Sequence, residues 1–214
     1  MYLNVAHTSK KVAFHSIGNY TANLMRKHGP WQIVSSQQIH ADPWMTLQVD
    51  QVIRPDGKQG TYTTASVKPG VCVVALDHQL NVYLTREFHY VVGKVTLEAV
   101  SGGVEANEEP IAAAQRELRE ELGIIATAWT HLGTVDPFTA SVLSPTQLFL
   151  AEQLVHVEHA PEGTELIEKV IMPLQQATAA VMHSEITHAA SCVAILKASL
   201  LRQKRVEQLC SIAQ

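Results

Sequence analysis

Three glutamates stand directly after an arginine, within six residues, and form the part of the chain best suited to chemistry. Arg116 is followed by Glu117, Glu120 and Glu121 in the segment RELREE. On a helix, residues three and four positions apart share a face, where like charges repel each other. A hard divalent cation offsets that repulsion, because Mg²⁺ binds carboxylate oxygens together with substrate phosphates. The spacing therefore predicts a metal-dependent site that acts on phosphates.

A solvated helix laced with charge is the alternative explanation of this segment, and charge runs usually mark such a face. Flanking residues at fixed spacing favour the chemical interpretation. Five residues separate Gly102 from Glu108, seven separate Glu108 from Arg116, and Gly123 and Ile124 close the pattern. This complete pattern is the Nudix box, and the chain resembles the Nudix hydrolases.

The resemblance implies a metal-binding role for four residues. Glu117 and Glu121 match the main carboxylate ligands of the family, and Glu120 matches a further one. The backbone carbonyl of Ser101, which precedes the glycine of the box, matches a backbone ligand. The expected cofactor is Mg²⁺ or Mn²⁺, since oxygen atoms are the ligands that such hard cations prefer.

The resemblance also implies the residues that support and carry out the reaction. Arg116 matches the arginine that orients the box glutamates, a role that its guanidinium fork suits better than lysine would. Glu108 matches the glutamate that supports the helix and this arginine. The acidic stretch at 162–168 falls where one branch of the family has a flexible loop with a catalytic glutamate. Glu165 is the expected general base, Glu162 is its reserve, and a solvated loop charge is the alternative. The expected catalytic residues are Arg116, Glu120 and Glu165.

One helix is expected to carry most of the box. It spans residues 109–122, because Pro110 suits the first turn of a helix and Gly123 suits the left-handed position just past the end. Apolar residues at helical spacing predict a stripe that faces the core, made of Ile111, Ala114, Leu118 and Leu122. A final helix at residues 188–209 has a comparable stripe of Ala189, Val193, Leu196 and Leu200.

Strand-like segments surround this helix on both sides. They lie at residues 31–35, 44–54, 61–67, 71–76, 82–90, 97–100, 129–135, 146–155 and 166–172. Pro55, Asp56 and Gly57 are a strong turn signal between the second and third segments. Strands interleaved with helices predict a mixed α/β layered domain, and the family's α/β/α sandwich around a mixed sheet agrees. We expect an N-terminal extension with a β-hairpin at residues 1–67 and the Nudix hydrolase domain at residues 68–214.

Further features are similar to the ADP-ribose pyrophosphatase branch of the family. Residues 97–102 resemble its entry to the box, and residues 163–168 fall at its catalytic loop. Residues 31–67 resemble its N-terminal β-extension, which exchanges across a homodimer and helps to build the substrate site. Residues 86–90 fall at a motif of that branch that contains an arginine. The resemblance implies five substrate-binding residues, namely Trp31, Trp44, Arg86, His89 and Glu98.

These substrate-binding assignments have alternatives. Trp31 and Trp44 could stack a purine ring, or could pack in a core or an interface, as amphipathic tryptophans often do. Glu98 could contact the ribose, could tune the metal site from outside its ligands, or could be a surface residue at a strand end. His89 stands where the branch has an arginine, and residues 136–140 lack its usual Pro-Gly step. These departures affect the expected substrate but leave the hydrolytic class unchanged.

The resemblance implies metal-dependent hydrolysis of a nucleoside diphosphate-linked compound. ADP-ribose or an ADP-sugar is the expected substrate, with AMP and a sugar phosphate as products. A Nudix hydrolase of another nucleotide (a GDP-sugar, NADH or a dinucleoside polyphosphate) is an alternative. A non-catalytic domain that senses nucleotides is a third possibility, but such sensors often lose box glutamates, and this chain keeps all of them.

Composition excludes several classes of partner. The net charge is −4 and no basic run occurs, so nothing indicates nucleic-acid binding. No apolar stretch suits a signal peptide or a membrane span, and we expect a cytoplasmic protein. The eleven histidines are scattered without the compact spacing of a zinc site. Exposed strand edges in residues 30–67 predict a homodimer with isologous contacts, because chains usually pair such edges.

Overall fold

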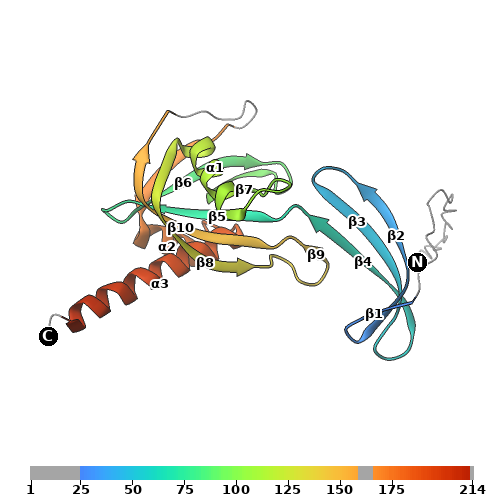
Figure 1. Cartoon of the computed structure of the whole chain (residues 1–214). Coiled ribbons are helices and arrows are strands. Elements are labelled where there is room, and N and C mark those ends of the chain that lie inside the picture. Colours follow the sequence, from blue (N-terminus) through green and yellow to red (C-terminus); the bar gives the residue numbers. More distant parts are fainter. Residues whose placement is uncertain (1–24, 159–165, 213–214) are drawn as a thin grey trace, which may run out of the picture. The chain divides into compact units, whose positions relative to one another are not determined.

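The computed structural model describes residues 25–158 and 166–212 of the chain (Figure 1). The chain divides into two compact units, Met1–Thr64 and Ala65–Gln214, and each is described by itself. Among the described residues, no helix is both long enough and apolar enough to cross a membrane. The cytoplasmic location expected from the sequence stays a prediction.

The N-terminal unit is built from antiparallel strands. β1 (Arg26–His28) pairs with β2 (Trp31–Ala41), β2 pairs with β3 (Met45–Ile53), and β4 (Gln59–Val67) is the next strand in the sheet. Gly57 turns the chain between β3 and β4, and its N–H donates to the carbonyl of Arg54 over 2.9 Å. The turn predicted at residues 55–57 is confirmed. The φ of 79° at Gly57 explains why glycine stands there.

The C-terminal unit contains a six-stranded mixed sheet in the order β11-β6-β7-β5-β10-β8. β10 is parallel to β5 and antiparallel to β8. The short β9 lies outside this sheet and pairs with Ala65 and Ser66 of β4. The strands are β5 (Gly70–Leu76), β6 (Asn81–His89), β7 (Lys94–Gly103), β8 (Ile124–Val135), β9 (Val142–Leu143), β10 (Thr146–His156) and β11 (Glu168–Pro173). The helices are α1 (Pro110–Leu122), α2 (Leu174–Met182) and α3 (Ala189–Ile212).

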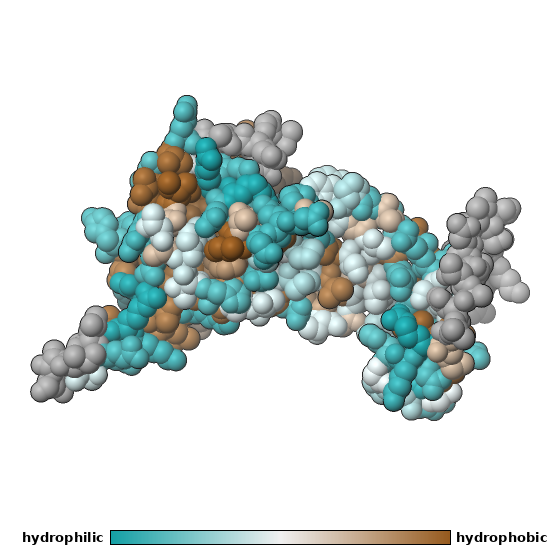
Figure 2. Space-filling model, in the orientation of Figure 1, coloured by the Kyte–Doolittle hydropathy of each residue, from teal (hydrophilic) through white to brown (hydrophobic). Residues whose placement is uncertain are grey.

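Helices cover both faces of this sheet, as Figure 1 shows. Alternate residues of a strand point to opposite faces, so β5 contributes to two separate cores. Val71 and Val73 are buried with Leu118 of α1 on one face, whereas Cys72 and Val74 are buried with residues of α2 and α3 on the other. In Figure 2, teal and white residues cover most of the visible surface, which agrees with this concentration of apolar side chains inside. The predicted α/β/α sandwich around a mixed sheet is confirmed.

The strand β7 leads the chain from the sheet into the box. Ala99 pairs with Leu84 of β6, whereas Val100 pairs with Val73 of β5, so β7 changes partner at this point. The loop after β7 ends at α1, whose first residue is Pro110. Gly123 follows α1 with a φ of 62°, as expected for a residue that ends a helix. The helix predicted at residues 109–122 is therefore confirmed.

The buried faces of two helices differ from the predicted stripes. In α1, Ile111 is exposed and Ala113 is buried instead. In α3, Leu200 is exposed, and the prediction for this helix is wrong in part. The residues that α3 buries most fully are Ala190, Ser191, Ala194, Ile195 and Ala198. α3 has apolar residues on more than one face, so periodicity alone does not select the face that meets the sheet.

Candidate active site

The first residue of the box lies against the first glutamate of its helix. Gly102 is in β7, Glu117 is in α1, and the two elements pack together. A Cβ atom at Gly102 would overlap the carboxylate group of Glu117. Any larger residue would therefore displace either this carboxylate or the backbone of β7. This close contact with Glu117 is a steric reason for the glycine at position 102 of the box.

Arg116 uses its whole guanidinium group to connect the box. Its Nε and Nη2 donate to the two carboxylate oxygens of Glu108 over 3.0 and 3.1 Å. Its Nη1 donates to Oε1 of Glu117 over 2.7 Å and to Oε2 of Glu120 over 3.0 Å. Nη2 also donates to the backbone carbonyl of Gly103 over 2.9 Å. A lysine ammonium cannot reproduce this planar set of donors.

The charges in this network stabilise each other. Hydrogen bonds from Arg116, with a smaller one from the backbone N–H of Glu105, hold the pKa of Glu108 below its usual value of 4.5. The same pairing raises the pKa of Arg116, with Glu108 as the largest contributor and Glu117 next among the carboxylates. Both groups are therefore ionised throughout the neutral pH range.

The oxygen atoms around α1 are chemically suited to a hard divalent cation. Glu117 and Glu121 are four residues apart on α1, and Ser101 immediately precedes the glycine against which Glu117 lies. Carboxylate and carbonyl oxygens are the ligands that Mg²⁺ and Mn²⁺ prefer. Within residues 25–158 and 166–212, no group of three His, Cys, Asp or Glu side chains is already arranged to hold a metal ion. Glu117 and Glu120 accept hydrogen bonds from Arg116 instead, and the metal-binding roles stay a prediction.

A pocket of about 510 Å³ opens between α1 and β8. Its volume is within the usual range for small-molecule sites, roughly 300–1,000 Å³. The guanidinium of Arg119 has no hydrogen-bond or ion-pair partner within the described part of the chain, so it offers a positive charge at the wall. The pocket is lined by Gln115, Arg116, Arg119, Glu120, Ile125, Ala126 and Trp129. The box helix thus has a cavity of ligand size along one side.

Glu98 gathers two histidines from distant parts of the chain. Its Oε1 accepts a hydrogen bond from Thr96 over 2.6 Å and lies 3.2 Å from Nε2 of His89. Its Oε2 lies 3.0 Å from Nδ1 of His188, directly before α3. Burial by itself would raise the pKa of Glu98, but the hydrogen bonds from His188 and Thr96 outweigh it and hold the pKa below 4.5. The structure thus brings together His89 and Glu98, two of the expected substrate-binding residues.

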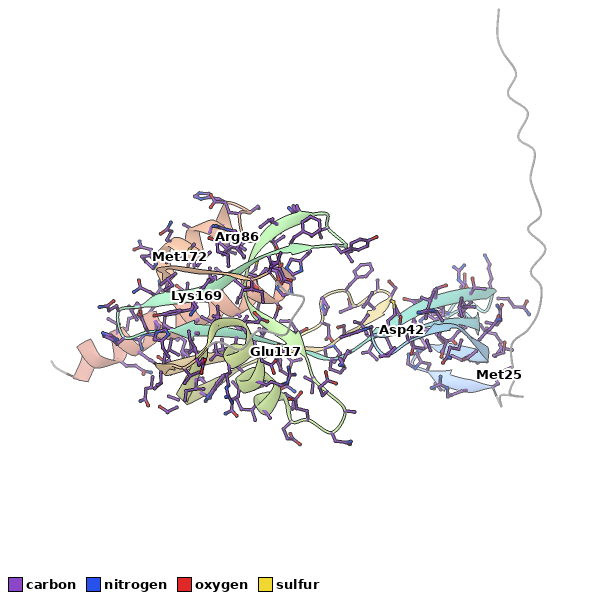
Figure 3. All side chains as sticks on the ribbon, turned by 90° about the horizontal axis from the view of Figure 1, so that it is seen from above. Met25, Asp42, Arg86, Glu117, Lys169 and Met172 are labelled. Atoms are coloured by element: carbon purple, nitrogen blue, oxygen red, sulfur yellow. The ribbon has the colours of Figure 1, made fainter. Side chains whose placement is uncertain are left out.

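Arg86 has a partner away from the box. Its Nη1 donates to both carboxylate oxygens of Glu168, over 2.9 and 3.1 Å, across the pairing of β6 with β11. Both side chains are exposed, so solvent screens the pair, and it contributes little to stability. Arg86 and Glu117 lie apart in Figure 3. A substrate-binding role for Arg86 stays a prediction.

Trp31 and Trp44 belong to the N-terminal unit and differ in their surroundings. Trp31 is partly buried and meets the ring of Tyr62 edge-on, with ring centroids 5.4 Å apart. Trp44 is exposed, and its backbone N–H donates to Oδ1 of Asp42 over 2.8 Å. Trp31 therefore has a packing role within its unit, whereas Trp44 presents an aromatic ring to solvent. Substrate stacking by either ring stays a prediction.

The expected general base, Glu165, and its reserve, Glu162, lie outside the described residues. Conversely, the sequence did not single out His188, Arg119 or Trp129 as site residues. No local motif marks these three side chains. His188 meets Glu98 of β7, and Trp129 of β8 lines the same pocket as Arg119 of α1, so these neighbours are set by the folded chain.

Two families match the chain. Residues 67–190 match the NUDIX domain, which is more than half of the chain and contains the complete box. Residues 31–64 match the nucleoside diphosphate sugar hydrolase N-terminal domain, and they fall within the N-terminal unit. The two matches therefore meet close to the division between the two compact units.

Similar proteins cover most of the chain. An ADP-ribose pyrophosphatase from Mycobacterium tuberculosis is 26% identical over 169 residues, which cover 78% of this chain and 82% of that protein. An ADP-ribose pyrophosphatase from Bacillus subtilis is 28% identical over 183 residues, which cover 80% of this chain and 96% of that protein. The crystal structure of an ADP compounds hydrolase shares the fold, with a TM-score of 0.73 at 18% identity, over 86% of this chain and 98% of the other.

The family match and the local geometry agree. The matched region holds Gly102 against Glu117 and keeps Arg116 bonded to its three glutamates. The chain therefore belongs to the NUDIX family and is a Nudix pyrophosphatase.

Proposed function

We propose that this chain hydrolyses the diphosphate bond of ADP-ribose or of an ADP-sugar, giving AMP and a sugar phosphate. The intact network around Arg116, with Glu117 seated against Gly102, is the observation that carries the proposal. Relatives named ADP-ribose pyrophosphatase and a structure named ADP compounds hydrolase support this substrate class. The match of residues 31–64 to a nucleoside diphosphate sugar hydrolase domain supports a sugar on the leaving half.

The proposed cofactor is Mg²⁺ or Mn²⁺, for which Glu117, Glu120, Glu121 and the Ser101 carbonyl would supply oxygen ligands. When bound, such a metal neutralises the charge of a diphosphate and lowers the pKa of the attacking water. The protein residues prepare this site before substrate arrives. Arg116 orients Glu117 and Glu120 through Nη1, because Glu108 and the Gly103 carbonyl hold the rest of the guanidinium in place.

Proton transfer is assigned to the segment after β10. In our proposal Glu165 accepts the proton of the attacking water, and Glu162 is the reserve. Proton transfer by a positioned side chain contributes roughly 10²–10⁴-fold to a reaction rate.

The N-terminal unit is proposed to mediate homodimer formation through its strand edges. Trp44 is exposed and Trp31 is partly buried, so Trp44 is the better candidate to stack on a purine ring. Hydrolysis of a GDP-sugar, NADH or a dinucleoside polyphosphate would use the same box chemistry. A nucleotide sensor without turnover is less consistent with the chain, because the box keeps all of its carboxylates and Arg116 holds two of them in order.

The proposal is tested by phosphate release, coupled through alkaline phosphatase, over a panel of nucleotides with Mg²⁺ or Mn²⁺. The panel contains ADP-ribose, ADP-glucose, GDP-mannose, NADH and diadenosine polyphosphates. Glu121→Gln is the control, because it removes a proposed ligand at nearly constant volume. We expect metal-dependent hydrolysis of ADP-ribose or ADP-glucose that is lost in the control.

Other outcomes overturn different parts of the proposal. Turnover of another nucleotide alone would reject the substrate and keep the chemistry, with His89 as the first residue to re-examine. Tight binding of a nucleotide without any turnover would reject catalysis and favour the sensor. Equal turnover by the wild type and Glu121→Gln would reject the assigned metal site.

A further inference from the structure

The carboxylate of Glu98 is enclosed and almost fully occupied. Its side chain is only 11% exposed. Oε1 has two partners, Thr96 at 2.6 Å and His89 at 3.2 Å, and Oε2 has His188 at 3.0 Å. Because a carboxylate oxygen accepts about two hydrogen bonds, little capacity is left for a substrate hydroxyl. Glu98 is therefore poorly placed to bind a ligand directly.

The two histidines that share this carboxylate are more open to solvent. The side chains of His89 and His188 are 39% and 34% exposed. Each directs one ring nitrogen at Glu98, which leaves Nδ1 of His89 and Nε2 of His188 free of any hydrogen bond within the described residues. An imidazole nitrogen can donate to a phosphate oxygen or accept from a sugar hydroxyl, depending on its protonation.

A second set of contacts fixes the position of His188. The backbone N–H of Ala99 donates to Oγ of Ser191, which is completely buried, and this Oγ lies 2.9 Å from Nδ1 of His188. Cys72 Sγ lies 3.9 Å from the same hydroxyl. His188 precedes α3 and Ser191 is in its first turn, so these bonds tie the start of α3 to β7. The histidine is thus held by the strand that continues to Ser101.

Glu98 belongs to the same strand, β7, as Ser101 and Gly102 of the box region. Burial raises the pKa of the Cys72 thiol to about 12, and the charges of Glu98 and Glu121 both contribute to the rise. Glu98 also stands three residues before Ser101 on β7. Through Glu98, the histidines are therefore anchored to the strand that forms one wall of the proposed reaction centre.

We propose that Glu98 is a positioning residue that aims His89 and His188 at the diphosphate-linked ribose half of the substrate, without touching the substrate itself. This inference rests on the proposed function and deepens it, because it assigns the recognition of phosphate and hydroxyl oxygens to two imidazoles. It also gives His188 a role that no sequence motif indicates.

A double-mutant cycle separates positioning from direct contact. The affinity for α,β-methylene ADP-ribose, a non-hydrolysable probe, is measured by calorimetry in the presence of Mg²⁺ for the wild type, Glu98→Gln, His89→Ala and the double variant. We expect each single variant to bind about tenfold more weakly, as for loss of a hydrogen bond to a charged group. The double variant should be weaker than His89→Ala only by the part of the Glu98→Gln loss that acts through His188, so the two single losses should sum to less than additive. Additive losses would overturn the inference.

Imidazole NMR supplies a readout that does not depend on turnover. Glu98→Gln should change the ring-nitrogen chemical shifts of both His89 and His188, and leave those of the exposed His183 unchanged. His188→Asn, which keeps a donor close to the position of Nδ1 but has no counterpart of Nε2, should lose about as much affinity as His188→Ala. Unchanged histidine spectra in Glu98→Gln would overturn the inference. If ADP-ribose is hydrolysed and the cycle is additive, the proposed function is kept and the inference is rejected. If the cycle is non-additive and no nucleotide is hydrolysed, the inference is kept and the proposed function is rejected.

Discussion

The carboxylate of Glu117 occupies the space that a Cβ atom at Gly102 would fill. This relationship joins two residues that are fifteen positions apart in the sequence and lie on different elements, β7 and α1. It also places the carboxylate beside the backbone of β7, where the Ser101 carbonyl precedes the glycine. Catalysis depends on such placement, since a shift of about 1 Å can cost roughly a hundredfold in rate.

Gly102→Ala is therefore expected to lower turnover by about a hundredfold while the fold is kept. The added methyl group would push the Glu117 carboxylate away from β7. Gly60→Ala is the matched control, because the nearest atom to its Cβ, at 3.2 Å, belongs to the flexible side chain of Arg54. Turnover is measured with the nucleotide panel, and circular dichroism checks the fold. Equal turnover in both variants would refute the steric account.

Arg116→Lys is expected to lower the free energy of unfolding by about 1–3 kcal/mol, because Glu108 loses charged hydrogen bonds and the glutamates lose their common donor. Arg119→Lys is the control on the same helix, and its effect should stay within about 0.5 kcal/mol, as for most surface substitutions. Urea denaturation of the two variants measures the difference. Similar losses for both would show that the Arg116 network does not stabilise the fold.

Glu165→Gln is expected to lower kcat by roughly 10²–10⁴-fold with little change in KM, because the variant cannot accept the proton of the attacking water. Glu162→Gln serves as the comparison, since Glu162 is the reserve base in the same segment. Steady-state kinetics with ADP-ribose measures both variants. A full rate in Glu165→Gln together with a large loss in Glu162→Gln would transfer the role to Glu162.

The Asp42 carboxyl in the N-terminal unit should titrate at about pH 2. A hydrogen bond with His40 lowers its pKa from 3.8 to about 2, with smaller effects from the backbone N–H groups of Met45 and Trp44. Because the folded pKa is depressed, the stabilising contribution is fully present above pH 3.8 and is lost as the pH falls from 3.8 through about 2. Carboxyl ¹³C NMR measures the midpoint. His40→Ala should raise it, and His78→Ala should not.

Light scattering at micromolar concentration is expected to give the mass of a homodimer. The physical reason is that an open sheet edge in the N-terminal unit would otherwise expose unpaired backbone groups. A shortened chain that begins at residue 65 is expected to lose this association. A monomeric mass for the full chain would contradict the proposed dimer.

Local sequence signals predicted the elements that position the box. Pro110 and Gly123 mark the two ends of α1, because a proline tolerates the first turn and a glycine adopts the left-handed φ of 62°. The Gly57 turn was predicted for the same kind of reason. The buried face of α3 was not predicted correctly, because Leu200 is exposed where the apolar spacing predicted burial. An apolar helix offers several faces, and packing against the sheet selects one of them.

The sequence by itself determined the family chemistry of this protein, because the box places its glutamates and its arginine within one helix and the loop before it. Their relative positions follow from 3.6 residues per turn, so local geometry is sufficient. Only the tertiary structure decided which residues from distant elements meet. Glu98 joins His188 because α3 begins beside β7, and Arg86 pairs with Glu168 because β11 lies next to β6. Such pairings depend on how the sheet and the helices pack, which no short stretch of sequence encodes.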